Sequence, residues 1–281
     1  MAGEIAVKIE NLSFTYSGGE KPALNKINLE IKRGEYLGIM GLNGAGKTTL
    51  GLSINGIVPQ STMGFYEGSV TVEGLDTATT PVREMARTVG IVFDNPEFQM
   101  SQVSAAEEVA LGLENLGVPN EEMPPRVGAA LGTVGLAGFE ERSPMGLSGG
   151  QQQRLAIASV LAMQPKILFM DEPTSNLDPI GKEEVFELAR KLNREEGMTV
   201  IVAEHEAEVL AAYADRIVVL HQGEIVMVGT PSEVFSRGAE LAKLGLRVPQ
   251  ATELAISLSA AGAKDLPVTT DQAITWLEAR S

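Results

Sequence analysis

A glycine-rich run at residues 41–48, GLNGAGKT, carries the clearest chemistry in this sequence. It fits the pattern G-x-x-x-x-G-K-[ST], follows the apolar stretch YLGIM and precedes a helical pattern, which disfavours a chance glycine turn. Glycines let backbone N–H groups turn inward around phosphate oxygens, and the start of a helix adds its positive dipole end. Lys47 can bind β- and γ-phosphates, and Thr48 can ligate Mg²⁺. The predicted nucleotide ligands are Gly41, Asn43, Gly44, Ala45, Gly46, Lys47, Thr48 and Thr49.

Two carboxylates end a second apolar stretch, ILFMDE at residues 167–172. A strand buried on both faces delivers its last side chains to the carboxyl edge of the sheet, where α/β folds bind ligands. Asp171 is then placed to hold Mg²⁺, and Glu172 to orient and deprotonate the attacking water. Taken alone, the stretch would equally suit an acidic strand-to-loop transition. Together with the phosphate-binding pattern, it predicts a hydrolytic site.

The third motif is LSGGQ at residues 147–151, followed by QQR. A lone LSGGQ would suit a plain helix cap, but its serine and glycine amides also suit an anion at a helix start. Lying between the two motifs above, it resembles the signature motif of ABC ATPases. The resemblance implies that Ser148, Gly149, Gly150 and Gln151 contact an ATP molecule held by a partner subunit.

Smaller segments agree with this resemblance. Tyr16 lies where the family places an aromatic ring against adenine, although a half-buried strand tyrosine is the plainer alternative. Residues 175–178, SNLD, resemble the loop that crosses the subunit interface, with Asp178 as its acidic member. His205 follows the apolar stretch TVIVA and matches the histidine that senses the γ-phosphate; the alternative is a structural histidine. The predicted catalytic residues are thus Glu172 and His205.

One position departs from the family pattern. After the stretch VGIVF, ABC proteins usually carry a glutamine that contacts Mg²⁺ and the attacking water, whereas this sequence has Asp94. Aspartate is shorter and only accepts hydrogen bonds, so it suits direct Mg²⁺ binding but cannot donate to water. The predicted metal ligands are therefore Thr48, Asp94 and Asp171. We expect activity, with a rate that Asp94 alters.

A narrower resemblance is to the ATPases of energy-coupling factor transporters, which import vitamins and transition-metal ions. It rests on VFDNPEFQ at residues 92–99, similar to F-Q-N-P-[DE]-x-Q apart from Asp94. It also rests on the tail LGLRVP at residues 244–249, which continues into TEL at residues 252–254 and resembles the C-terminal helical extension of that group. The tail also suits a generic helical cap. The transported molecule is not identified by the sequence.

The resemblance implies how such a chain works. Two subunits, identical or paralogous, bury two ATP molecules head to tail; ATP closes the dimer and hydrolysis reopens it. A surface near residues 94–102 would pass this motion to a transmembrane coupling subunit that serves a substrate-binding membrane subunit, which places the chain peripherally on the cytoplasmic face of the membrane. The alternative is a soluble or regulatory ABC ATPase. A nucleotide kinase or switch GTPase has no reason to carry LSGGQ.

Composition narrows the class of protein. The chain has 281 residues, of which 44% are apolar, no cysteine, and a formal net charge of −15. The apolar content allows a sizeable core, and the absence of cysteine excludes disulfides and cysteine metal sites. The acidic balance argues against a nucleic-acid partner. The start MAGEIAVKIENLSF lacks the pattern of a signal peptide, and the most apolar stretch, residues 155–170, is shorter than the roughly 20 residues of a membrane span.

Hydrophobic periodicity predicts an α/β fold with a parallel central sheet. The resemblance to ABC ATPases implies that this fold is a P-loop NTPase with a RecA-like core. Expected strands are Ala6–Glu10, Ile27–Ile31, Tyr36–Met40, Gly68–Val72, Val89–Phe93, Ile167–Asp171, Thr199–Ala203 and Arg216–Leu220, the early ones in an antiparallel β subdomain. Expected helices are Lys47–Asn55, Ser104–Leu116, Glu121–Val134, Gln151–Ala162 and Lys182–Glu196. We expect an ABC ATPase domain at residues 1–236, with an inserted helical subdomain at about 94–150, and a C-terminal helical extension at 237–281.

Overall fold

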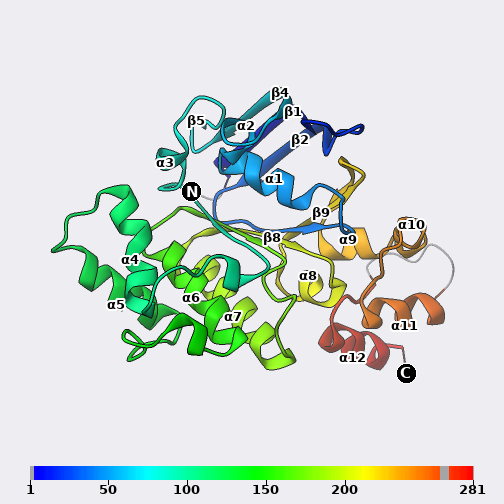
Figure 1. Cartoon of the computed structure of the whole chain (residues 1–281). Helices are drawn as coiled ribbons and strands as arrows, with labels where there is room; N and C mark the ends of the chain where they lie inside the picture. Colours follow the sequence, from blue (N-terminus) through cyan, green and yellow to red (C-terminus); the bar gives the residue numbers. More distant parts are fainter. Residues whose placement is uncertain (1–2, 260–265, 281) are drawn as a thin grey trace.

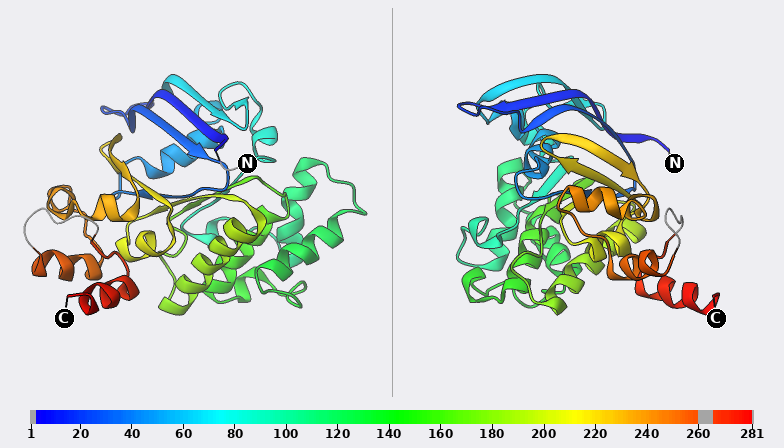
Figure 2. Two further views of the ribbon diagram at one scale, coloured as in Figure 1. Left: turned by 180° about the vertical axis from the view of Figure 1, so that it is seen from behind. Right: turned by 90° about the vertical axis from the view of Figure 1, so that its right-hand side faces the viewer.

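The computed structural model of the protein describes residues 3–259 and 266–280. Its strands form two sheets, and helices cover the larger one (Figure 1). The smaller sheet lies at the top of Figure 1, helices α4 and α5 lie at one end of the larger sheet, and the C-terminal helices lie at the other. Both views in Figure 2 keep these helical groups at opposite ends.

The six-stranded sheet is the centre of the molecule, in the order β10-β9-β3-β8-β7-β6. Neighbouring strands run parallel except β10, which is antiparallel to β9. The strands are β3 (Tyr36–Met40), β6 (Val89–Val92), β7 (Ile167–Asp171), β8 (Thr199–Glu204), β9 (Arg216–His221) and β10 (Glu224–Gly229). Every residue of β3, β7 and β8 is buried, as their continuous apolar runs predict.

The four-stranded sheet is antiparallel, with order β2-β1-β4-β5, which confirms the predicted β subdomain. Its strands are β1 (Ile5–Tyr16), β2 (Leu24–Lys32), β4 (Gly64–Val72) and β5 (Leu75–Asp76). The prediction for the first strand, Ala6–Glu10, was too short. A register shift lies between Ile9 and Leu12, and Asn11 has a φ of 49°. This bulge interrupts the alternation on which the prediction depended.

The predicted helices are all present, with ends moved by a few residues. They are α1 (Lys47–Ile54), α4 (Ala105–Leu116), α5 (Met123–Thr133), α6 (Gly149–Leu161) and α7 (Pro179–Glu196). Helix α7 begins earlier than expected because Asp178 caps it and Pro179 fits its first position. Short helices α2 (Ile57–Gln60), α3 (Val82–Met85) and α8 (Ala207–Tyr213) were not predicted.

Alternate residues of the central strands supply two cores, one on each face of the sheet. On β7, Leu168 and Met170 join the cluster formed with helices α4–α7. Ile167 and Phe169 join the opposite cluster, formed with α1 and the antiparallel sheet. This period of two fixes which side chains face α1, the helix that follows the phosphate-binding pattern.

The chain ends in helices α9 (Pro231–Phe235), α10 (Gly238–Lys243), α11 (Gln250–Leu258) and α12 (Thr270–Glu278). Leu241, Leu246 and Val268 share a buried cluster with residues of β3, β9 and α8. Thr252 Oγ1 donates to the carbonyl oxygen of Pro267 at 2.7 Å, which ties α11 to the segment before α12. The domain division after residue 236 stays a prediction. Across residues 3–259 and 266–280, no helix has the length and apolarity needed to cross a membrane.

Gly51 tests the contact between α1 and β7. A Cβ at Gly51 would lie 2.4 Å from the Phe169 ring, whereas one at Gly128 in α5 would meet nothing within 4 Å. We expect Gly51→Ala to lower the free energy of unfolding by about 1–3 kcal/mol through overpacking. The control Gly128→Ala should raise it by about 0.5–1 kcal/mol. Urea unfolding measures both, and equal effects would contradict the packing described here.

Candidate functional site

The register of three parallel strands sets the position of the site. Met40 at the end of β3 pairs with Glu204 of β8, and Asp171 at the end of β7 pairs with Ala203. The carboxyl ends of these strands therefore lie at one edge of the sheet. The loops that follow them carry residues 41–48, Glu172 and His205 to the same place.

The loop of residues 41–48 requires its glycines. Gly46 has a φ of 108°, a left-handed conformation that side-chain-bearing residues rarely adopt. A Cβ at Gly41 would lie 2.5 Å from the carbonyl oxygen of Leu220, so the loop passes close to β9. The turn after β9 supports the loop as well, since the N–H of Gly223 donates to the carbonyl oxygen of Ala45 at 3.0 Å.

Lys47 is the cation of the site, and its side chain is 5% exposed. Its Nζ donates to the carbonyl oxygens of Gly41 and Leu42 at 2.7 and 3.2 Å, and lies 2.9 Å from Oε1 of Glu172. The loop thus curls around its own lysine, which also neutralises the Glu172 carboxylate that follows β7, two strands away in the sheet.

Asp171, the last residue of β7, and Glu172, which follows it, have different environments. Thr48 Oγ1 donates to Oδ2 of Asp171 at 2.5 Å. Burial raises the pKa of the Asp171 carboxyl above its ordinary value, and the hydrogen bond from Thr48 opposes that shift. Glu172 has a φ of 45°, unusual for a residue with a side chain, and a strained backbone of this kind clusters at functional sites.

A cavity of about 420 Å³ gathers most of the predicted ligands. Its lining includes Tyr16, Asn43, Gly44, Gly46, Lys47, Thr48, Thr49, Asp94, Asp171 and Glu172. Tyr16 is exposed, at 37%, and its hydroxyl is hydrogen-bonded to Oγ1 of Thr49 at 3.0 Å. Ala45 and Gly41 belong to the loop without lining the cavity. The structure therefore brings the predicted phosphate, metal and aromatic residues to one place.

His205 stands beside this group. Its Nδ1 lies 3.7 Å from Oε2 of Glu172 and 3.1 Å from Oε1 of Glu204. Glu204 was not predicted as a functional residue. The signal available was the pair of carboxylates flanking His205, in the sequence EHE.

The signature segment, residues 147–151, does not line the cavity. Ser148 caps α6: its hydroxyl accepts from the N–H of Gln151 at 3.4 Å, and its own N–H donates to the Gln151 side chain at 3.0 Å. Gly149 is exposed and Gly150 partly so. Asp178 is also exposed and caps α7 by accepting from the N–H of Gly181 at 2.7 Å. Within one chain, none of these residues lines the phosphate-loop cavity.

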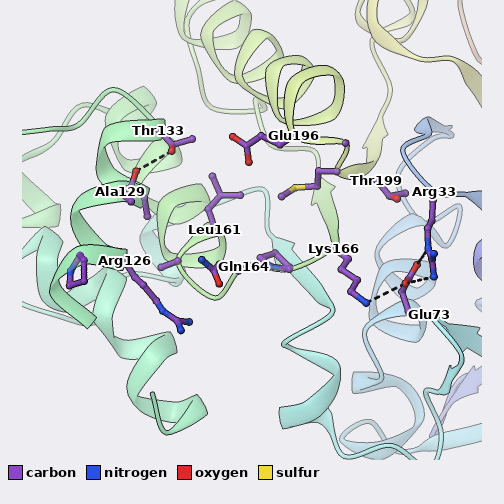
Figure 3. A pocket seen from close by; sticks show the side chains of 16 residues that line it. Arg33, Glu73, Arg126, Ala129, Thr133, Leu161, Gln164, Lys166, Glu196 and Thr199 are labelled. Carbon is purple, nitrogen blue, oxygen red and sulfur yellow. Dashed lines mark hydrogen bonds and ion pairs between the residues drawn. The ribbon is translucent and has the colours of Figure 1, made fainter. Parts of the chain in front are cut away.

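A larger cavity, of about 730 Å³, lies away from these residues and contains no predicted ligand (Figure 3). Its cations are paired within the protein. Arg33 and Lys166 both contact Glu73, and Arg126 contacts Glu122. With its charges already compensated, this cavity is a weaker anion site than the one at the phosphate loop.

Comparison with known proteins identifies the family of the chain. The model of the ABC transporter family matches residues 24–175. The chain belongs to this family: it is an ABC transporter ATP-binding subunit, and its enzymatic class is the ABC-type ATPase.

Relatives and solved structures add detail. The chain is 43% identical to an energy-coupling factor transporter ATP-binding protein of Lacticaseibacillus paracasei, over 91% of this chain and 90% of that protein. It is 35% identical to cbiO1 of Clostridium perfringens, part of the ABC transporter complex cbiONQ, with a TM-score of 0.75 over 90% of this chain and 99% of that one. A dimeric ATP-binding cassette bound to ADP and Pi in a post-hydrolysis state is 34% identical, with a TM-score of 0.69 over 80% and 98% of the two chains.

The ion pair of Lys47 and Glu172 can be tested without nucleotide. Lys47→Met should lower the free energy of unfolding by about 1–3 kcal/mol, because Glu172 and two carbonyl groups lose their partner. Adding Glu172→Gln should restore part of this loss, giving a coupling of about 0.5–3 kcal/mol in a double-mutant cycle.

The control is Lys182→Met, which removes a more exposed pair with Glu206 and should cost about 0–1 kcal/mol. Urea unfolding supplies the free energies. Strictly additive effects of Lys47→Met and Glu172→Gln would show that the two side chains do not interact.

Proposed function

We propose that this chain powers an energy-coupling factor importer for a vitamin or a transition-metal ion, peripherally on the cytoplasmic face of the membrane. Its partners would be a second ABC ATPase, identical or paralogous, a transmembrane coupling subunit and a substrate-binding membrane subunit. The likeness to an energy-coupling factor ATPase and to cbiO1 supports the transporter class. The observation that carries the proposal is the separation of the signature segment from the phosphate-loop cavity within one chain.

That separation calls for a second subunit. Ser148 and the exposed Gly149 stand at the start of α6, where backbone N–H groups and the helix dipole favour an anion. Because they do not line the cavity of their own chain, the ATP they contact would be bound by another subunit. ATP would therefore act as part of the interface, closing the dimer, and its hydrolysis would reopen it.

The residues at the cavity suit Mg²⁺ as well as ATP. Thr48, Asp94 and Asp171 offer a hydroxyl and two carboxylates, the hard oxygen ligands that this cation prefers. They are few, which fits a cation that keeps waters and takes further ligands from the phosphates. Bound there, Mg²⁺ would neutralise charge that develops on the phosphate oxygens.

Lys47 and Glu172 would change partners when ATP binds. Lys47 now contacts Glu172 at 2.9 Å, and incoming β- and γ-phosphates would compete for the same ammonium group. Losing its cation, Glu172 would be free to orient a water molecule and take its proton. His205, 3.7 Å from Glu172, would contact the γ-phosphate and complete the catalytic pair.

The proposed contact with the membrane subunit lies near residues 94–102. Phe98 and Val103 are 88% and 77% exposed there. The loop beneath them is held firmly: the side chain of Gln99 accepts from the N–H of Phe93 at 3.1 Å, and Glu108 accepts from the N–H groups of residues 101 and 102 at 2.7 and 2.9 Å. A fixed loop that carries Asp94 at one end and exposed apolar groups at the other can couple the cavity to a partner.

Mg²⁺-dependent ATP hydrolysis and oligomeric state, measured together, test the proposal. Wild type should hydrolyse ATP, and Glu172→Gln should reduce turnover by about 10²–10⁴-fold while trapping an ATP-bound dimer. Copurification with membrane subunits should follow from wild type and weaken in Phe98→Ser. A wild type that fails to bind ATP would refute the proposed site, and a competent ATPase that never associates with membrane subunits would refute the transport role.

Asp94→Gln, measured in the same assay, tests the departure from the family pattern. Glutamine restores a donor to the attacking water and removes one negative charge from the cavity. We expect faster turnover than in wild type. A matched control is Glu97→Gln, an exposed change in the same loop that does not line the phosphate-loop cavity and should leave the rate unchanged. Slower turnover in Asp94→Gln would show that the aspartate is required instead.

A further inference from the structure

Glu204 is a buried carboxylate with an unusual set of partners. It ends β8 and is 2% exposed. Among the described residues, no lysine or arginine forms an ion pair with it. Its Oε1 accepts from the N–H groups of His205 and Glu206 at 2.7 and 3.2 Å, and its Oε2 accepts from the hydroxyl of the buried Thr174 at 3.5 Å. A buried charge without a cation is costly, which suggests a role beyond stability.

The geometry places this carboxylate beside the ring of His205. Nδ1 of His205 lies 3.1 Å from Oε1 of Glu204 and 3.7 Å from Oε2 of Glu172. Lys47 already contacts Glu172 at 2.9 Å, whereas Glu204 has only neutral donors besides this ring. Glu204 is therefore both the nearer and the less compensated of the two carboxylates.

We propose that Glu204 is a positioning residue for His205: its carboxylate keeps the ring proton on Nδ1 and fixes the ring, which leaves Nε2 for the phosphate. A carboxylate beside one imidazole nitrogen determines which tautomer forms. The effect on hydrolysis rests on the proposed role of His205, whereas the effect on the tautomer does not.

The surroundings of Glu204 agree with such a role. Burial raises the pKa of its carboxyl, and the hydrogen bonds from the N–H groups of His205 and Glu206 oppose that shift. Glu206 itself is paired with Lys182, on α7, so it does not compete for the ring. Thr174 belongs to the loop after β7 that also carries Glu172. Glu204 thus contacts both the loop after β7, which carries Glu172, and the loop after β8, which carries His205.

Nitrogen NMR of ¹⁵N-histidine-labelled protein tests the proposal directly. The chain has two histidines, so His221 serves as an internal reference. At a pH where both rings are neutral, wild-type His205 should carry its proton on Nδ1, and Glu204→Gln should shift the population toward Nε2–H. The control Thr174→Val removes the other side-chain partner of Glu204 and should leave the tautomer unchanged.

Measurements of ATP hydrolysis distinguish a failure of this inference from a failure of the proposed function. Glu204→Gln should lower kcat about tenfold with KM for ATP unchanged, and His205→Ala should lower it no further when combined with Glu204→Gln. A tautomer that shifts while kcat stays constant would support the positioning of the ring and refute the catalytic role of His205. A wild-type ring protonated on Nε2 would overturn the proposal, even if Glu204→Gln did not fold. A His205 tautomer that Glu204→Gln leaves unchanged would also overturn the proposal.

Discussion

The register of the parallel strands β3, β7 and β8 is the constraint on which the site depends. All three strands are buried on both faces, so a slip of one residue would exchange the side chains that face the two cores. With the register fixed, Met40 lies opposite Glu204 and Asp171 opposite Ala203. The loops that follow these strands therefore begin at the same edge of the sheet. Short loop segments are then enough to bring Lys47, Glu172 and His205 together.

The charges that line the cavity bear on the ligand proposed for it. Its lining holds three carboxylates, Asp94, Asp171 and Glu172, against one buried lysine, Lys47. A bare triphosphate would add further negative charge, whereas the proposed triphosphate with a divalent cation would supply the compensation that Asp94 and Asp171 lack. In the structure Lys47 is shared between Glu172 and loop carbonyl groups, an arrangement that phosphate binding would reorganise.

The sequence predicted those parts of the fold that depend on short, contiguous residue patterns. The glycine pattern around Lys47 and the apolar run before Asp171 each combine a strand with a following polar group, and both lie where expected. The first strand was underestimated because a bulge at Asn11 breaks its alternation. Glu204 was overlooked because a carboxylate after an apolar run resembles the start of a loop, and only the fold shows that it is buried against His205. Helical spacing in the tail did not reveal that Leu241 shares a buried cluster with residues of β9 and α8, because spacing does not identify the partner of a helix face.

Site-specific cross-linking tests the central claim, a nucleotide site shared between two subunits. The chain has no cysteine, so single cysteines can be placed at will. Asn43→Cys marks the phosphate loop, Met145→Cys marks the exposed approach to the signature segment, and Ala129→Cys marks the distant cavity of Figure 3 as a control. With ATP, a short bifunctional thiol reagent should join Asn43→Cys of one subunit to Met145→Cys of another, and should not join it to Ala129→Cys. Absence of the first product, or equal yields of both, would contradict the account.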